Sequence, residues 1–175
     1  MLDMKGNTLK STIFSLLCFL ASFALYGVTN KIDKATMTYE RRDGLAVRFF
    51  DGDSIHVHFK GDPKPVMARL YGIDAPEKDQ DYGLTASARL RELIKDKPLE
   101  FEIRGTDSHK RLLVVVYYNG LNVNLQMLRE GLAWHYDRFD GSPDFAAAHQ
   151  EAKTHKRGLW INSKAISPEE FRHKK

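Results

Sequence analysis

The chain has 175 residues, of which 42% are hydrophobic and 29% are charged, which suits one compact domain plus a leader rather than several domains. A formal net charge of +4 favours a polyanionic partner through electrostatic steering, without specifying which one. Cys18 is the only cysteine, which excludes a disulfide within the chain.

The amino-terminal segment has the pattern of an export signal. Lys5 and Lys10 precede an apolar run over residues 13–28, and residues 22–24 have the small-x-small pattern of a signal-peptidase site. We therefore expect residues 1–28 to be a cleaved signal peptide. The mature protein would be secreted or periplasmic, without stable membrane association. An uncleaved membrane anchor is the alternative, although the run falls short of the ~20 apolar residues of a usual span.

The strands are expected from residue 44 onward. Residues 29–43 are polar and lack a hydrophobic period, which predicts a linker before a compact domain at 44–165. In the predicted hairpin of residues 45–50 and 54–59, apolar residues alternate with polar ones over 54–59, which predicts one buried face. Further strands are expected at 66–71, 99–103 and 112–118.

The helices are expected between and after these strands. Apolar residues at helical spacing predict helices over 86–94 and 123–130, and Ser142 is the expected N-cap of a third that runs to about Lys156. Five short strands with about three helices predict an α+β fold, a Greek-key barrel of the OB type. The basic residues in 166–175 predict a solvated tail.

Two pairs of carboxylates stand out along the chain. Asp51 and Asp53 flank Gly52, which could take a positive φ and turn the chain tightly, and Asp74 and Glu77 follow the third expected strand. Their hard oxygen atoms suit a cation such as calcium. Each pair alone is unspecific, because an Asp-Gly-Asp sequence is usually only a turn.

Two arginines complete this set of residues. Arg69 lies in the third expected strand, and Arg111 precedes the fifth. A guanidinium group can bind two phosphate oxygens at once and stays charged at any working pH. Carboxylates, a cation and paired arginines together point to phosphodiester chemistry.

Six segments resemble the thermonuclease (staphylococcal nuclease-like) family in order and approximate spacing. They are Asp51-Gly52-Asp53-Ser54, residues 69–77, Tyr82-Gly83, residues 107–111, residues 129–133 and residues 157–160. The resemblance covers roughly residues 45 to 160, and the block at 69–77 is its most specific part. It implies an OB barrel and a calcium-dependent, sugar-nonspecific nuclease that cleaves DNA and RNA to products with 3′-phosphates.

The resemblance also implies metal ligands. Asp53 and Asp74 match the calcium-binding carboxylates of the family, and Ala75 matches a position that donates its main-chain carbonyl.

The same resemblance implies catalytic residues. Glu77 matches the general base that activates water, and Arg69 and Arg111 match the arginines that grip the phosphate. The family commonly has a Tyr-Gly-Arg turn where this chain has His109-Lys110-Arg111. Lysine tolerates a positive φ poorly, so the direction of Arg111 stays open.

Other residues receive plainer interpretations. His149 and His155 are expected at the surface, and Tyr136 is the aromatic residue that we weigh for base stacking, without assigning it a site. The rival function is a catalytically inactive OB-fold nucleic-acid-binding module. A pure binding module would not need the full set of acids and arginines. Nothing in the sequence demands a dimer, so we expect a monomer.

Overall fold

The structure is a computed structural model that describes residues 38–174, in which residue 39 begins one compact unit. The expected signal peptide at 1–28, its alternative as an anchor, and Cys18 lie outside the described residues. Within 38–174, no helix combines the length and the apolar character that crossing a membrane requires.

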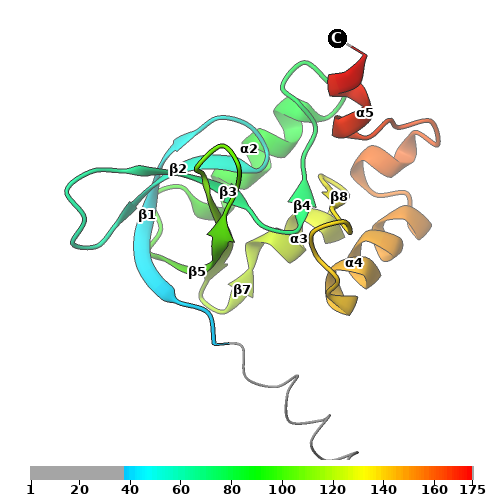
Figure 1. Cartoon of the computed structure of the whole chain (residues 1–175). Helices are drawn as coiled ribbons and strands as arrows, with labels where there is room; N and C mark the ends of the chain where they lie inside the picture. Colours follow the sequence, from blue (N-terminus) through cyan, green and yellow to red (C-terminus); the bar gives the residue numbers. More distant parts are fainter. Residues whose placement is uncertain (1–37, 175) are drawn as a thin grey trace, which may run out of the picture. The chain divides into compact units, whose positions relative to one another are not determined.

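Five strands form a closed barrel (Figure 1). They are β1 (Arg41–Phe49), β2 (Ser54–Phe59), β3 (Val66–Leu70), β5 (Leu99–Thr106) and β6 (Leu112–Tyr118). The order β3-β2-β1-β5-β6 is antiparallel throughout, and a parallel pairing of β3 with β6 closes the ring. The predicted five-stranded OB-type barrel is therefore confirmed.

The remaining elements lie beside the barrel. They are β4 (Ile73–Asp74), α2 (Gly83–Ile94), β7 (Leu121–Asn122), α3 (Val123–Arg129), β8 (Trp134–His135), α4 (Pro143–Thr154), the 3-10 helix η1 (Gly158–Ile161) and α5 (Pro168–His173). The three predicted helices are α2, α3 and α4. The two-residue strands β4 and β8, which pair with each other, are too short to leave a periodic pattern in the sequence.

The core follows from the alternation expected in β2. Ile55, Val57 and Phe59 are each at most 1% exposed, and the ring of Phe59 meets that of Phe101 edge to face at 5.5 Å between centroids. His56, on the opposite face of β2, packs its ring against Phe50. The predicted hairpin therefore buries the face that the sequence indicated.

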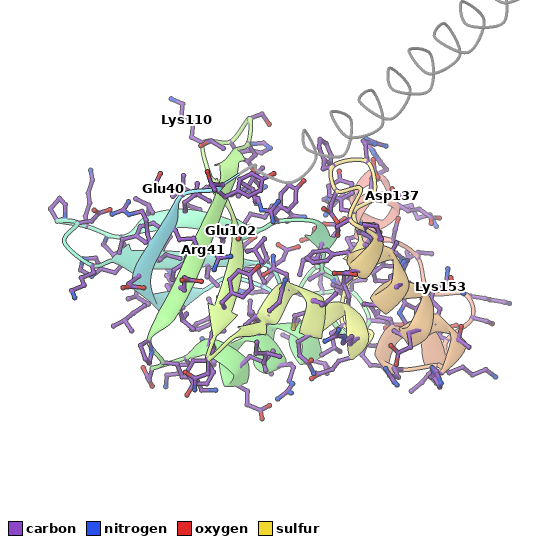
Figure 2. All side chains as sticks on the ribbon, turned by 90° about the horizontal axis from the view of Figure 1, so that it is seen from below. Glu40, Arg41, Glu102, Lys110, Asp137 and Lys153 are labelled. Carbon is purple, nitrogen blue, oxygen red and sulfur yellow. The ribbon has the colours of Figure 1, made fainter. Side chains whose placement is uncertain are left out.

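The barrel begins earlier than expected. We predicted a linker to residue 43, but β1 starts at Arg41 and pairs there with Glu102 of β5. The guanidinium of Arg41 also binds the carboxylate of Glu102 at 2.6 Å, and Figure 2 shows the two side by side. The start of β1 shows no hydrophobic period because the side chain of Arg41 pairs with a charged side chain on the neighbouring strand.

The carboxyl-terminal segment is also more ordered than expected. We predicted a solvated tail at 166–175, but α5 occupies residues 168–173. The hydroxyl of Ser167 caps this helix by accepting from the main-chain N–H of Glu170 at 3.1 Å, and Pro168 is at its first turn and buried. In Figure 1, α5 lies next to the loop that follows β4.

Candidate functional site

A cavity of about 980 Å³ opens at one end of the barrel. Of the metal ligands and catalytic residues expected from the sequence, Asp53, Arg69, Ala75, Glu77 and Arg111 line it. Asp74 adjoins it through an ion pair with Arg69. The structure therefore brings together residues that the chain spreads over about sixty positions.

The turn between β1 and β2 positions Asp53. The side-chain Oδ1 of Asp51 accepts from the main-chain N–H groups of Asp53 at 3.0 Å and Ser54 at 2.7 Å, which holds the turn. Asp51 is thus a local cap in addition to a residue of the cavity wall.

Gly52 is required for a different reason from the one we expected. Its φ is not among the positive values of the described residues. A Cβ at this position would instead lie 2.7 Å from the Cβ of Ala75 and 2.8 Å from the Cβ of Ala86. The prediction of a positive φ is wrong, because the glycine serves a close approach of three segments.

Arg69 joins the two aspartates. Its Nη1 donates to Oδ1 of Asp53 and its Nη2 donates to Oδ1 of Asp74, both at 2.6 Å. The side chain of Arg69 is only 13% exposed, so these charge-assisted contacts are largely shielded from water. The guanidinium is thereby fixed at the cavity wall between two acids.

Asp53 is a buried carboxyl with several donors. Its Oδ2 accepts from the main-chain N–H of Ala75 at 2.8 Å, and its Oδ1 accepts from the hydroxyl of Ser54 at 2.9 Å. Burial raises the pKa of Asp53 to about 7, against the opposing effect of Arg69. A divalent cation nearby would favour the ionised form of this carboxyl.

Asp74 is oriented by the pairing of β4 with β8. Ile73 points into the core, and the alternation of the strand turns Asp74 the other way, toward Arg69. The buried amide of Asn124 supports this region, since its Nδ2 donates to the carbonyl oxygens of Tyr71 and Val114. No local pattern indicates this role for Asn124, because its partners lie 53 and 10 positions away.

Glu77 has a partner that the sequence did not predict. Its Oε1 accepts from Nη1 of Arg172 in α5 at 2.8 Å, and Nη2 of Arg172 donates to Oδ2 of Asp74 at 3.0 Å. Gln80 links the same loop to the segment before α5, because its Nε2 donates to the carbonyl of Ile166 at 2.8 Å. No local pattern could have indicated a contact across 95 positions.

Arg111 is held by Asp107 in the β5–β6 hairpin. Oδ2 of Asp107 accepts from Nε and Nη2 of Arg111 at 2.8 and 2.7 Å. Burial raises the pKa of Asp107, but hydrogen bonds from Arg111 outweigh burial and hold it below the usual range. Lys110 does adopt a positive φ of 62° and projects from the hairpin tip (Figure 2).

Some of the histidine and aromatic residues lie where the sequence led us to expect them, and others do not. Tyr136 lines the cavity and packs edge to face on Phe139, with centroids 4.8 Å apart. His155 is exposed as expected. His149 is half-buried rather than fully at the surface: its ring packs against that of Trp160 with centroids 5.0 Å apart, and burial lowers its pKa to about 4.

The donor atoms suit a hard cation that retains several water ligands. Asp53 and Asp74 supply carboxylate oxygens on either side of Arg69, and the guanidinium of Arg172 already lies on Asp74 as a positive charge. Within residues 38–174, no group of three or more His, Cys, Asp or Glu side chains is arranged to hold a metal. A metal here would therefore need main-chain or water oxygens as well.

The chain is similar to known nucleases. The sequence model for staphylococcal nuclease homologues matches residues 67–162. An uncharacterized endonuclease of Haemophilus influenzae is 35% identical over 133 residues, covering 76% of this chain and 74% of that protein. An uncharacterized endonuclease of Escherichia coli is 38% identical over 133 residues, covering 75% of this chain and 86% of that protein.

A plant protein extends the similarity. It is described as a probable staphylococcal-like nuclease of Oryza sativa subsp. japonica and is 33% identical over 146 residues, which are 81% of this chain and 44% of that longer protein. These matches agree with the barrel and with the resemblance identified in the sequence. The chain belongs to the family of staphylococcal nuclease homologues.

Proposed function

We propose that this chain is a calcium-dependent nuclease that hydrolyses phosphodiester bonds of DNA, RNA or both and leaves 3′-phosphates. The main support is the shared cavity, whose wall contains Asp53, Arg69, Glu77 and Arg111. Similarity to endonucleases of two bacteria supports the same reaction class.

In this proposal, Glu77 accepts a proton from the water that attacks phosphorus. Arg69 and Arg111 stabilise the negative charge that grows on the phosphoryl oxygens, in a site whose acids and arginines are mostly shielded from solvent. Both guanidinium groups are fixed by aspartates, so little reorganisation is needed when that charge develops.

The proposed ligands of calcium are the carboxylates of Asp53 and Asp74 and the main-chain carbonyl of Ala75. Calcium would supply positive charge beside the reacting phosphate. The same charge would offset the burial of Asp53, whose pKa is raised to about 7.

We further propose export and a monomeric state. Both rest on the sequence pattern alone, since the leader lies outside the described residues. Amino-terminal sequencing of protein recovered outside the cytoplasm tests cleavage near residue 28. An intact leader on membrane-bound protein would support the anchor instead.

An inactive nucleic-acid-binding module is the second candidate, and one observation favours it. Arg172 covers Glu77 and Asp74, so the proposed base and a proposed ligand are both engaged.

The deciding experiment is digestion of labelled single- and double-stranded DNA and RNA with calcium or with chelator. With calcium we expect cleavage that leaves 3′-phosphate ends. With chelator we expect no cleavage. Cleavage that withstands chelator would contradict the metal proposal. Binding without cleavage under both conditions would support the inactive module.

A further inference from the structure

The carboxyl-terminal helix α5 places a guanidinium on the acids of the cavity. We propose that Arg172 is an autoinhibitory cover, which occupies Asp74 and Glu77 in the resting protein and is displaced when calcium binds. This inference rests on the proposed function, because it assigns Asp74 to the metal and Glu77 to the attacking water.

The contacts of Arg172 are with the two groups that the reaction needs free. Nη2 donates to Oδ2 of Asp74 at 3.0 Å, Nη1 lies 3.4 Å from Oδ1 of the same residue, and Nη1 donates to Oε1 of Glu77 at 2.8 Å. An oxygen that accepts from a guanidinium is less able to bind calcium or to take a proton from water. Arg172 and a divalent cation therefore compete for Asp74.

Exposure makes the cover removable. The side chain of Asp74 is 4% exposed, whereas that of Arg172 is 42% exposed. The acid is thus shielded in part by a side chain that is itself in contact with solvent. Water around the exposed guanidinium screens its ion pairs and limits the net stability that they contribute.

The attachment of α5 is also modest. The helix has six residues, far below the ~12–15 at which an isolated helix becomes marginally stable. Its attachments include buried Pro168, an ion pair of Arg138 with Glu169 at 3.3 Å and the hydrogen bond from Gln80 to Ile166. Segments with such attachments open locally at low free energy.

A different role for Arg172 would be a third guanidinium for the phosphate. One contact favours the cover. Arg172 binds Glu77, the proposed base, whereas the acids that Arg69 and Arg111 bind are aspartates. A phosphate-binding role predicts that removal of Arg172 lowers turnover. An autoinhibitory cover predicts that its removal raises the rate of cleavage at low calcium.

The test compares the full chain with Arg172→Gln and with Lys174→Gln as matched control. Lys174 pairs with Glu170 within one helical turn, so its loss removes the same charge from α5 without touching Asp74 or Glu77. Calcium binding is measured by calorimetry, and exchange of the main-chain amides of residues 169–173 is measured with and without calcium.

We expect Arg172→Gln to bind calcium more tightly by ~5- to 150-fold, the usual range of coupling between two sites, and to cleave DNA faster at low calcium. Lys174→Gln should match the wild type. In the wild type, calcium should speed amide exchange in α5. Glu169→Gln, which loosens α5 from Arg138, should shift calcium binding in the same direction by less.

Several results would overturn the proposal that Arg172 is an autoinhibitory cover. Equal calcium affinity in the wild type and Arg172→Gln would overturn it while leaving the proposed nuclease function intact. Unchanged calcium binding with lost turnover would assign Arg172 to catalysis. Absence of calcium binding in every variant would overturn the metal proposal, and the cover with it. Thermal melting of each variant confirms that it is folded.

Discussion

Asp107 holds Arg111 through both of its carboxylate oxygens. Oδ1 accepts from the main-chain N–H of Arg111 at 2.9 Å, and Oδ2 accepts from its Nε at 2.8 Å. The guanidinium is thus fixed at the cavity edge by a residue of its own hairpin. Arg111 therefore lines the cavity although Lys110, at the turn before it, has a positive φ of 62°.

Arg111→Lys should lose most nuclease activity while the fold survives. An ammonium group cannot reproduce the two-nitrogen contact with Asp107 or a two-oxygen contact with phosphate. We expect kcat/KM to fall by ~100- to 1000-fold, the usual effect of losing one such electrostatic donor. The measurement is steady-state cleavage at saturating calcium, with a thermal melt alongside. Near-wild-type turnover would remove Arg111 from the mechanism.

Asp107→Asn should lower kcat/KM less than the loss of Arg111 does. The guanidinium would remain but would be held more loosely, because one charge-assisted acceptor is lost. Asp62→Asn is the control, since Asp62 pairs with Arg42 at 2.5 Å and does not line the cavity. If both variants reduced cleavage equally, the orienting role of Asp107 would be excluded.

Glu77→Gln should remove the proton acceptor and leave substrate binding largely intact. We expect kcat to fall by ~100- to 10,000-fold, the usual contribution of general acid–base catalysis. Glu92→Gln, at a side chain 71% exposed on α2, is the control. A kcat close to that of the wild type would argue that another group takes the proton.

Gly52→Ala should destabilise the protein by ~1–3 kcal/mol, as overpacking does. The added Cβ would meet Ala75 and Ala86 at 2.7 and 2.8 Å, a separation that requires main-chain shifts. Gly141→Ala is the matched control, because nothing lies within 4 Å of a Cβ there and its φ is not positive. Chemical denaturation measures both, and an unchanged free energy of unfolding for Gly52→Ala would refute the close-packing argument.

The contribution of His149 to stability should fall as the pH is lowered from about 6.5 to about 4, whereas Asp53, whose pKa is raised to about 7, contributes in the opposite direction. Burial is the main cause that lowers the pKa of His149 to about 4, whereas its ordinary value is 6.5. Between these values the unfolded chain binds a proton that the folded chain does not, so acid favours unfolding. His149→Phe should weaken this pH dependence, and His155→Phe, at an exposed position, should not. Melting temperatures measured across this pH range give the comparison.

The sequence by itself determined the barrel and the identity of the acids and arginines. Alternating residues such as Ile55 and Val57 mark a buried strand face, because side chains on a strand alternate between its two sides. The helix beginning at Pro143 was equally predictable, since proline and Asp144 in its first turn are local signals. Ser142 is its N-cap residue, but its hydroxyl donates to Asp140 and makes no capping hydrogen bond. These are local patterns, and the structure retains them.

Only the tertiary structure decided how those residues are engaged. Arg69 lies between Asp53 and Asp74, Gly52 serves a close approach, and Arg172 reaches Asp74 across 98 positions. Contacts between distant positions leave no period or spacing in a sequence, because they depend on where the closed barrel brings separate segments. The sequence therefore indicates which chemical groups take part, and the tertiary packing decides which partner each group contacts.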